Sequence, residues 1–313
     1  LKKVRSQNKV VENLSAYRSD SINFNGRVFC LVTGASRGIG RALAIQISQQ
    51  MGPNSVLLLL ARTTDELIKT VDLCRKDNIE VVSLPIDLGK TPLEDFEVDL
   101  FLQSHLPNAQ SFDYAMVVHN VGSIGDLTIE TCKMDNSEDM RRYYDLNVFN
   151  IISMNTKFLK FFQDFDEKVI IVNITSLCAI KPMGGMAYYC SGKAAREMYF
   201  KVLAEEKPQM RILNYSPGPV RTDMIDYVID NTVNENLKEV FTSFKNQGTL
   251  LQPEVTMGGG KKSLFMFLMQ LAWRCRFSMP LILSGTAALL GRAYMIQIRV
   301  HSGDTMYENE VSL

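Results

Sequence analysis

The chain has 313 residues, of which 46% are hydrophobic, and its 34 lysines and arginines balance 34 aspartates and glutamates. A zero net charge argues against a basic surface for nucleic acid, and the length suits one α/β domain of about 250 residues with extensions. The six cysteines are scattered without a C-x-x-C pair, and only three histidines occur. This pattern predicts neither a disulfide framework nor a metal site, and it favours a cytoplasmic protein with reduced thiols.

The first 26 residues are polar and basic, and they hold no apolar run long enough for a secretory signal peptide. We predict a flexible extension over residues 1–26, with an amphipathic targeting segment as the alternative. The folded domain is expected to begin at residue 27.

The apolar run VFCLVT predicts a buried strand, and it is followed by a glycine-rich turn and a helical segment. The glycines have the spacing G-x-x-x-G-x-G, which lets backbone N–H groups approach a pyrophosphate at the positive end of a helix. Since a lone glycine cluster is often only a turn, its place between strand and helix is what favours nucleotide binding. The candidate residues are Gly34, Ala35, Ser36, Arg37, Gly38, Ile39 and Gly40.

The second strand, SVLLLLAR, ends at Ala61 and Arg62, where a site for NAD would carry an acidic residue. Two guanidinium groups, from Arg62 and from Arg37 in the glycine turn, suit a 2′-phosphate, so we predict NADPH/NADP as the cofactor. An ordinary solvated strand end is the alternative for Arg62. The third strand, EVVSLPID, ends at Asp87 and Leu88, which are suited to bracketing an adenine.

The fourth strand, within DYAMVVHNVG, ends at Asn120 and Gly122, which we expect beside the cofactor. His119 has no acid or base partner nearby in the sequence, and we interpret it as structural. Residues 137–165 predict one long amphipathic helix containing Asn147. Because a buried asparagine inside a helix is unfavourable without a task, we expect Asn147 to hold a water that connects to Lys193.

The segment from residue 176 to residue 193 combines a hydroxyl, a phenol and an ammonium group. Ser176 closes the apolar strand VIIVNITS, while Tyr189 and Lys193 lie four apart at the start of a helix and therefore share one face. We expect the ammonium to lower the tyrosine pKa from its ordinary value near 10, which predicts a proton-transfer site for a carbonyl or an alcohol. The plain alternative is a buried tyrosine beside a surface lysine.

A further strand and a proline-glycine turn follow in RILNYSPGPVRTDM. Pro217 and Gly218 are expected where the nicotinamide lies. Thr222, Asp223 and Met224 are expected at a helix N-terminus, whose donors can receive a carboxamide or a phosphate. Residues 225–250 are polar and helix-prone, as in a mobile lid.

These elements together resemble the short-chain dehydrogenase/reductase family over about residues 27–256. TGASRGIG, NVG, Asn147, Ser176, Tyr189, Lys193 and PGPVRTDM occur in family order, although the usual NNAG is here HNVG. The resemblance implies a doubly wound parallel sheet of the Rossmann type, with Asn147, Ser176, Tyr189 and Lys193 as catalytic residues. It further implies a cofactor site that includes Val220, Tyr189 and Lys193.

NITSLCAIKP, YCSGKAAREM and RILNYSPGPV resemble the branch of the family that reduces ketones in pterin side chains. This resemblance implies an NADPH-dependent enzyme of the last step of tetrahydrobiopterin formation, working as a cytoplasmic homodimer. The implied substrate contacts are Ser176, Leu177, Tyr189 and Gly218. A general carbonyl reductase and a non-catalytic NADPH-binding module are the alternatives.

Residues 257–313 depart from that branch. They are rich in glycine and methionine and include an apolar stretch that arginines and a proline interrupt. The stretch is too short between charges for a membrane-spanning helix, which leaves a monotopic membrane contact, an added core helix or dimer segment, or a grafted, non-native tail. Asp304 does not fall at the family spacing of a pterin-anchoring aspartate, so we assign it no substrate contact.

Overall fold

A computed structural model of the chain describes residues 26–90, 102–103, 111–254, 282–286, 295–302 and 305–312. The predicted extension over residues 1–26 lies outside these residues except at its end, as does Asp304. The strands of the main body are β1 Val28–Thr33, β2 Ser55–Ala61, β3 Ile79–Pro85, β4 Tyr114–His119, β5 Val169–Ile174 and β6 Arg211–Ser216. The helices are α2 Gly38–Gln50, α3 Thr64–Cys74, α5 Ser137–Tyr144, α6 Asn150–Phe161, α7 Ala187–Glu206, α8 Asp223–Asn231 and α9 Glu235–Asn246.

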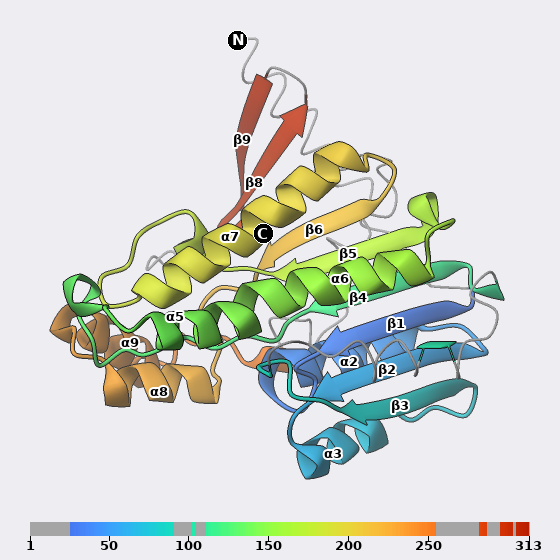
Figure 1. Cartoon of the computed structure of the whole chain (residues 1–313), viewed down its shortest axis with the longest axis horizontal. Helices are drawn as coiled ribbons and strands as arrows, with labels where there is room; N and C mark the ends of the chain where they lie inside the picture. Colours follow the sequence, from blue (N-terminus) through green and yellow to red (C-terminus); the bar gives the residue numbers. More distant parts are fainter. Residues whose placement is uncertain are drawn as a thin grey trace.

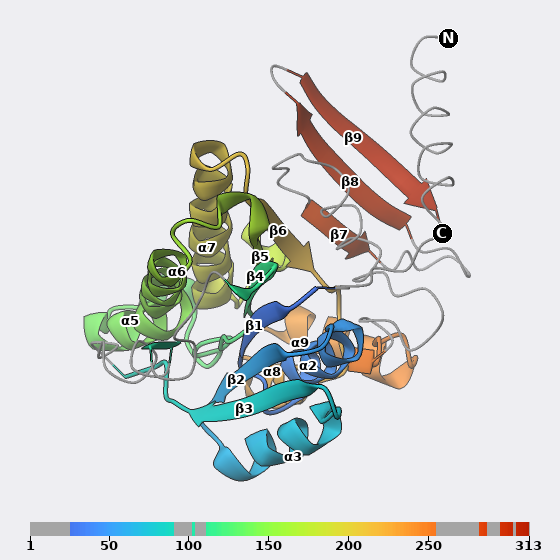
Figure 2. The same ribbon diagram turned by 90° about the vertical axis from the view of Figure 1, so that its right-hand side faces the viewer.

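The strands of the main body form a parallel sheet in the order β3-β2-β1-β4-β5-β6. Helices α2 and α3 cover one face, and α5, α6 and α7 cover the other, as the two views show (Figures 1 and 2). The chain crosses from one half of the sheet to the other between β3 and β4, so the switch point lies between the adjacent strands β1 and β4, where α/β sheets bind their ligands. The predicted doubly wound fold is confirmed.

The sheet is buried on both faces, which explains why its strands are continuous apolar runs rather than alternating patterns. Every residue of β1, β2 and β5 is buried. On one face Leu43 and Ile47 of α2 pack against the sheet. On the other face Met154 and Phe158 of α6 pack against Phe29 of β1. Burial of a large apolar side chain stabilises the fold by about 1.5–3 kcal/mol.

The prediction of one continuous helix over residues 137–165 is wrong. The segment divides into α5 and α6 around a wider π-helical turn, Asp145–Phe149, and α6 ends at Phe161. Such a turn inserts one residue into the helical repeat and is frequent at functional sites. Asn147 lies within this turn and is buried.

Three strands of the C-terminal segment extend the sheet. They are β7 Ile282–Thr286, β8 Met295–Ser302 and β9 Thr305–Ser312. β7 pairs parallel to β6 through two residues, and β8 and β9 continue antiparallel. The described residues of this segment form strands, and none of them forms the added core helix that was one alternative for the tail. Among the described residues, no helix is long and apolar enough to cross a membrane.

Candidate active site

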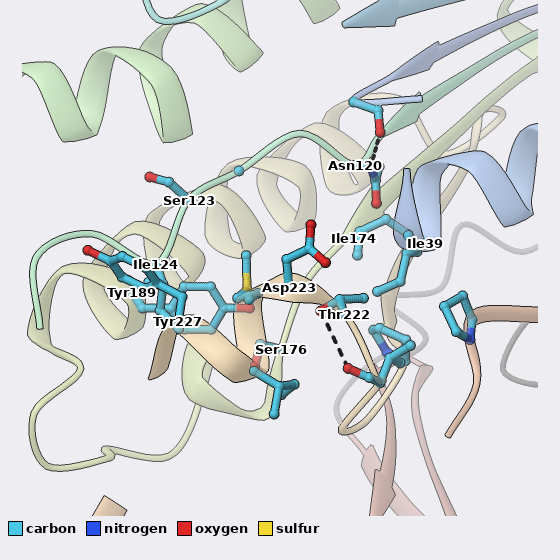
Figure 3. Close-up of a pocket in the computed structure, with 18 of the residues that line it drawn as sticks. Ile39, Asn120, Ser123, Ile124, Ile174, Ser176, Tyr189, Thr222, Asp223 and Tyr227 are labelled. Carbon is cyan, nitrogen blue, oxygen red and sulfur yellow. Dashed lines mark hydrogen bonds between the residues drawn. The ribbon is translucent and has the colours of Figure 1, made fainter. Parts of the chain in front are cut away.

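A cleft of about 1260 Å³ opens at the carboxyl ends of the parallel strands. Figure 3 shows side chains from several elements facing it, among them Asn120, Ser176, Tyr189 and Thr222. The predicted site residues that line it are Gly34, Ser36, Arg37, Gly38, Ile39, Ala61, Arg62, Leu88, Asn120, Gly122, Ser176, Leu177, Tyr189, Lys193, Pro217, Gly218, Val220, Thr222, Asp223 and Met224. The predicted residues that do not line it are Ala35, Gly40, Asp87 and Asn147.

The glycine turn leads from β1 into α2, so the helix N-terminus faces the cleft. Gly34 and Gly38 have φ values of +67° and +54°, which other residues rarely adopt. A Cβ at Gly38 would lie 3.2 Å from the Thr222 side chain, so the turn and the start of α8 face each other at close range. The side-chain-free backbone and the free N–H groups of the first turn of α2 fit a pyrophosphate between them.

Gly40 serves packing rather than the cleft. A Cβ there would lie 2.2 Å from the Gly34 carbonyl oxygen and 2.5 Å from Asn120 Nδ2. Asn120 Nδ2 in turn donates hydrogen bonds of 3.1 Å to the carbonyls of Thr33 and Gly34. The end of β4 thereby holds the glycine turn in place.

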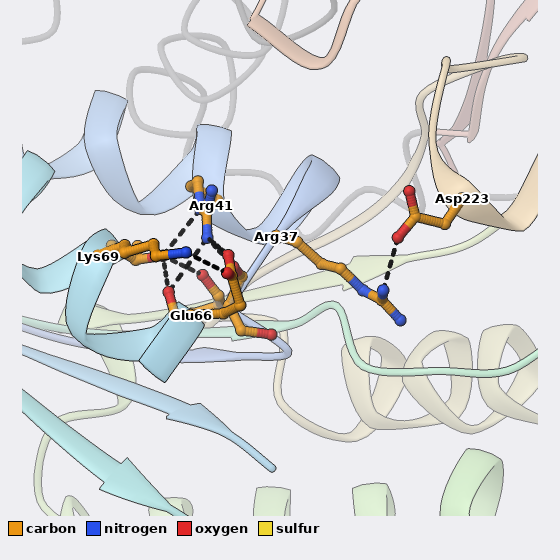
Figure 4. A network of polar contacts seen from close by, with 8 residues as sticks. Arg37, Arg41, Glu66, Lys69 and Asp223 are labelled. Carbon is orange, nitrogen blue, oxygen red and sulfur yellow. Dashed lines mark hydrogen bonds and ion pairs between the residues drawn. The ribbon is translucent and has the colours of Figure 1, made fainter. Parts of the chain in front are cut away.

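The end of β2 brings one basic group to the cleft and the glycine turn brings another, as predicted. Arg62 is exposed at the cleft wall. Arg37 lies at the cleft mouth, where its guanidinium forms an ion pair with Asp223 (Figure 4). Asp87 does not face the cleft, and its carboxylate accepts the Gly89 N–H at 2.9 Å instead. Of the two residues predicted to bracket an adenine, Leu88 lines the cleft and Asp87 does not.

Ser176, Tyr189 and Lys193 converge in the cleft. Ser176 follows β5 and caps a short 3-10 helix, Leu177–Ala179, by accepting the Cys178 N–H at 3.2 Å. Tyr189 lies in the first turn of α7 and lines the same cleft as Ser176. Lys193 Nζ lies 5.6 Å from the centre of the Tyr189 ring and donates to the Ile174 carbonyl at 2.7 Å.

The expected lowering of the Tyr189 pKa is wrong for this arrangement. Burial raises the pKa of Tyr189 to about 12, although the Ser176 hydroxyl and the charge of Arg196 oppose the shift. Burial and the nearby Arg196 guanidinium lower the pKa of Lys193 well below its usual range. The sequence shows the helical spacing of phenol and amine, but it does not show that both groups are desolvated.

Asn147 joins the π-helical turn to the chain after β4. Its Oδ1 accepts the Ser123 N–H at 2.8 Å, and its Nδ2 donates to the Tyr143 carbonyl at 2.8 Å and to Ser123 Oγ at 3.0 Å. A Cβ at Gly122 would lie 3.2 Å from Asn147 Oδ1 and 3.9 Å from Lys193 Nζ. The amide and the amine thus border the same small space beside Gly122.

His119 is buried behind the cleft, away from its lining. Its Nε2 is 3.0 Å from Asn155 Oδ1, and burial lowers its pKa to about 3. This environment keeps the imidazole neutral and agrees with a structural role.

Several residues of the site were not predicted. The Thr33 hydroxyl bonds the N–H groups of Asn120 and Val121 at 3.0 and 3.2 Å. Apolar side chains of α8 and α9 form one wall of the cleft, and the spacing of Phe241 and Phe244 on one helix face was a usable signal for it. The most important residue that we did not predict is Arg196. Its spacing from Tyr189 and Lys193 in the sequence places the three side chains on one face of the helix.

The family model described as short chain dehydrogenase matches residues 29–232, which is most of the folded domain. The chain belongs to the short-chain dehydrogenase family. The family resemblance seen in the sequence is therefore confirmed, and the chain is an oxidoreductase of this family.

Two curated relatives indicate branches of the short-chain dehydrogenase family. The chain is 34% identical over 236 residues to the sepiapterin reductase of Bos taurus, covering 74% of this chain and 87% of the relative. It is 25% identical over 236 residues to a benzil reductase of Bacillus subtilis (strain 168), covering 73% and 89%. Among solved structures, the KRED1-Pglu enzyme matches with a TM-score of 0.61 and 25% identity, over 79% of this chain and 95% of that one.

Proposed function

We propose that this short-chain dehydrogenase reduces a ketone in the side chain of a pterin, with NADPH as the hydride donor. The observation that carries the proposal is the convergence of Ser176, Tyr189 and Lys193 on the cleft that the glycine turn also lines. The identity to a sepiapterin reductase supports the pterin as substrate. The basic groups of Arg37 and Arg62, without an acidic residue at the end of β2, support NADPH over NADH.

The roles of the side chains follow from their chemistry. The bound nicotinamide supplies the hydride, while the protein binds and orients. Tyr189 carries its proton at neutral pH, because its pKa is raised to about 12, and it is placed to donate that proton to a ketone oxygen. Ser176 lines the cleft beside Tyr189 and would orient the same oxygen, and Leu177 and Gly218 would border the substrate.

The binding of the cofactor is assigned to the residues that face the cleft. The backbone from Gly34 to Ile39 would hold the pyrophosphate, and Lys193 the nicotinamide ribose. Pro217, Gly218, Val220, Thr222, Asp223 and Met224 would surround the nicotinamide end. A water in the space between Asn147 Oδ1 and Lys193 Nζ would return a proton toward Tyr189, since a carbonyl oxygen has two lone pairs and the Ser123 N–H takes one.

An assay of NADPH oxidation by the full chain tests the proposal. We expect sepiapterin to support faster turnover than benzil, measured as kcat/KM, and NADH to replace NADPH poorly. Preference for benzil would favour the second candidate, a general carbonyl reductase, which the benzil reductase relative supports. Binding of NADPH by fluorescence without oxidation in the presence of either ketone would favour a non-catalytic module.

We also propose a cytoplasmic homodimer whose interface includes α7. Met198 and Val202 lie one helical turn apart on α7 and expose 59% and 47% of their surface. Neighbouring exposed apolar side chains of this size favour an interaction surface. Light scattering on the purified chain, with Met198→Glu as the disrupting variant, tests the dimer.

A further inference from the structure

Arg196 lies on α7 seven residues after Tyr189 and three after Lys193, so the three side chains share one face of the helix. Its side chain is only 1% exposed. It does not line the cleft, yet a Cβ at Gly122 would lie 3.8 Å from Arg196 Nη1 and 3.9 Å from Lys193 Nζ. The guanidinium therefore stands directly behind the backbone that forms the floor of the cleft.

The guanidinium joins the ends of two neighbouring strands. Nη1 donates to the Val121 carbonyl at 2.8 Å, and Nη2 donates to the His119 carbonyl at 2.8 Å. Nε and Nη2 both donate to Asn173 Oδ1, at 3.1 and 2.7 Å. These four bonds fix the chain after β4 against β5, and this is the stretch that carries Asn120 and Gly122 into the cleft.

All four of these hydrogen bonds end on neutral oxygens. The carboxylate next in sequence, Glu197, accepts instead from Thr175 Oγ1 at 2.8 Å and pairs with Lys201 at 2.7 Å. Burial lowers the pKa of Arg196 to about 10, which leaves it charged at neutral pH. A buried cation bonded only to neutral groups is costly for stability, and such groups concentrate at functional sites.

The positive charge acts on the titratable groups around it. Arg196 lowers the pKa of Lys193 and opposes the burial that raises the pKa of Tyr189. The other titratable groups that face Tyr189 are Cys178 after β5, Cys190 on α7 and Tyr143 on α5, and none of these carries a positive charge. Lys193 is the other basic side chain near Tyr189, but burial lowers its pKa.

We propose that Arg196 is a positioning residue for the reaction, which fixes the Asn120–Gly122 segment and supplies a positive charge that stabilises the phenolate left when Tyr189 gives up its proton. The inference rests on the proposed role of Tyr189.

Two substitutions separate the charge of Arg196 from its hydrogen bonds. Arg196→Gln keeps an amide donor without charge, and Arg196→Lys keeps the charge without the planar fork. Arg27→Met is the matched control, because Arg27 bonds the Asn54 carbonyl and Ser111 at the opposite end of β1. Circular dichroism establishes which variants fold.

The primary readout is the ionisation of Tyr189 at about pH 8, where Arg196 is charged, taken as the rate at which tetranitromethane, a reagent that attacks phenolates, nitrates Tyr189. At this pH we expect Arg196→Gln to reduce the ionised fraction of Tyr189, and with it the nitration rate, about tenfold, which corresponds to one pKa unit, and Arg196→Lys to restore most of it. In parallel, kcat should fall about tenfold in Arg196→Gln and recover in Arg196→Lys, with Arg27→Met unchanged in both readouts.

Equal ionisation of Tyr189 in the wild type and in Arg196→Gln would overturn the proposal, as would equal losses in the Gln and Lys variants. Failure of both variants to fold would assign Arg196 to folding alone and would also overturn it. The ionisation readout needs no turnover. A wild type that does not reduce sepiapterin, with a clear shift of Tyr189 ionisation in Arg196→Gln, would therefore contradict the proposed function and leave the charge assignment standing.

Discussion

Arg37 and Asp223 meet at 2.5 Å across the mouth of the cleft and join the glycine turn to the first residue of α8. Both side chains are largely exposed, at 68% and 73%. Asp223 pairs with the Arg37 guanidinium, which a 2′-phosphate would also use, so the carboxylate competes with the cofactor. Asp223→Asn should therefore lower the KM for NADPH about two- to fivefold, the range of an exposed ion pair. Initial rates at low and high salt check this, because salt screening should remove the gain.

The control for this change is on the same helix. Asp226 forms an ion pair of the same kind with Lys245 at 2.6 Å, away from Arg37. Asp226→Asn should leave the KM for NADPH unchanged. An equal effect of both variants would mean that α8 as a whole, rather than the pair with Arg37, limits cofactor binding.

Arg62 should determine the preference between the two nicotinamide cofactors. Arg62→Ala should raise the KM for NADPH about 10- to 100-fold and leave that for NADH nearly unchanged, because a hydrogen bond to a charged group is worth about 1.5–3 kcal/mol. Arg75→Ala removes an exposed arginine that pairs with Asp72 at the end of α3 and is the matched control. A loss shared by NADPH and NADH would point to damage of the site rather than to a phosphate contact.

Gly40 should tolerate no side chain. In Gly40→Ala the new Cβ would meet the Gly34 carbonyl oxygen at 2.2 Å, so the backbone of the glycine turn has to move. We expect a loss of about 1–3 kcal/mol in the free energy of unfolding, together with weaker NADPH binding. Urea unfolding and cofactor fluorescence measure the two effects.

Gly248 provides the comparison for Gly40. Its φ is +64°, so Gly248→Ala is strained, but nothing lies within 4 Å of the new Cβ. Gly248→Ala should lower the free energy of unfolding by about 1–2 kcal/mol and leave the NADPH affinity unchanged. If both variants lost the cofactor equally, the close packing of the glycine turn would not be the cause.

His119 should make stability depend on pH. Its pKa is about 3 in the folded chain against about 6.5 when unfolded, so between these values the unfolded chain binds the extra proton. Stability should therefore fall as the pH drops from 6.5 toward 3, by up to about 1.4 kcal/mol per pH unit. Urea midpoints between pH 4 and 7 should show a shallower slope for His119→Gln, and parallel slopes would exclude His119 as the source.

The strands and the glycine turn could be predicted from the sequence because a parallel sheet buried on both faces leaves continuous apolar runs. Arg62 and Ser176 could be placed in one cleft because the carboxyl ends of parallel strands meet at one edge. Asn147 was correctly singled out as a buried polar residue, although its π-helical turn depends on how α5 and α6 pack and leaves no local pattern.

The charges of the site could not be predicted in the same way. Tyr189 and Lys193 have the expected helical spacing, but their pKa values depend on burial and on Arg196, which only the folded arrangement reveals. Asp87 shows the same dependence on tertiary structure, because its carboxylate accepts the Gly89 N–H and does not line the cleft. Spacing in the sequence predicts which groups share a face, whereas their protonation is set by tertiary contacts.

The central claim is that the phenol of Tyr189 delivers a proton inside the cofactor cleft. The most direct measurement compares sepiapterin-dependent NADPH oxidation in the wild type and in Tyr189→Phe, with NADPH affinity measured by fluorescence in both. We predict a fall in kcat of about a hundredfold or more, with NADPH affinity within about twofold of the wild type. A Tyr189→Phe variant that keeps full turnover would contradict the account.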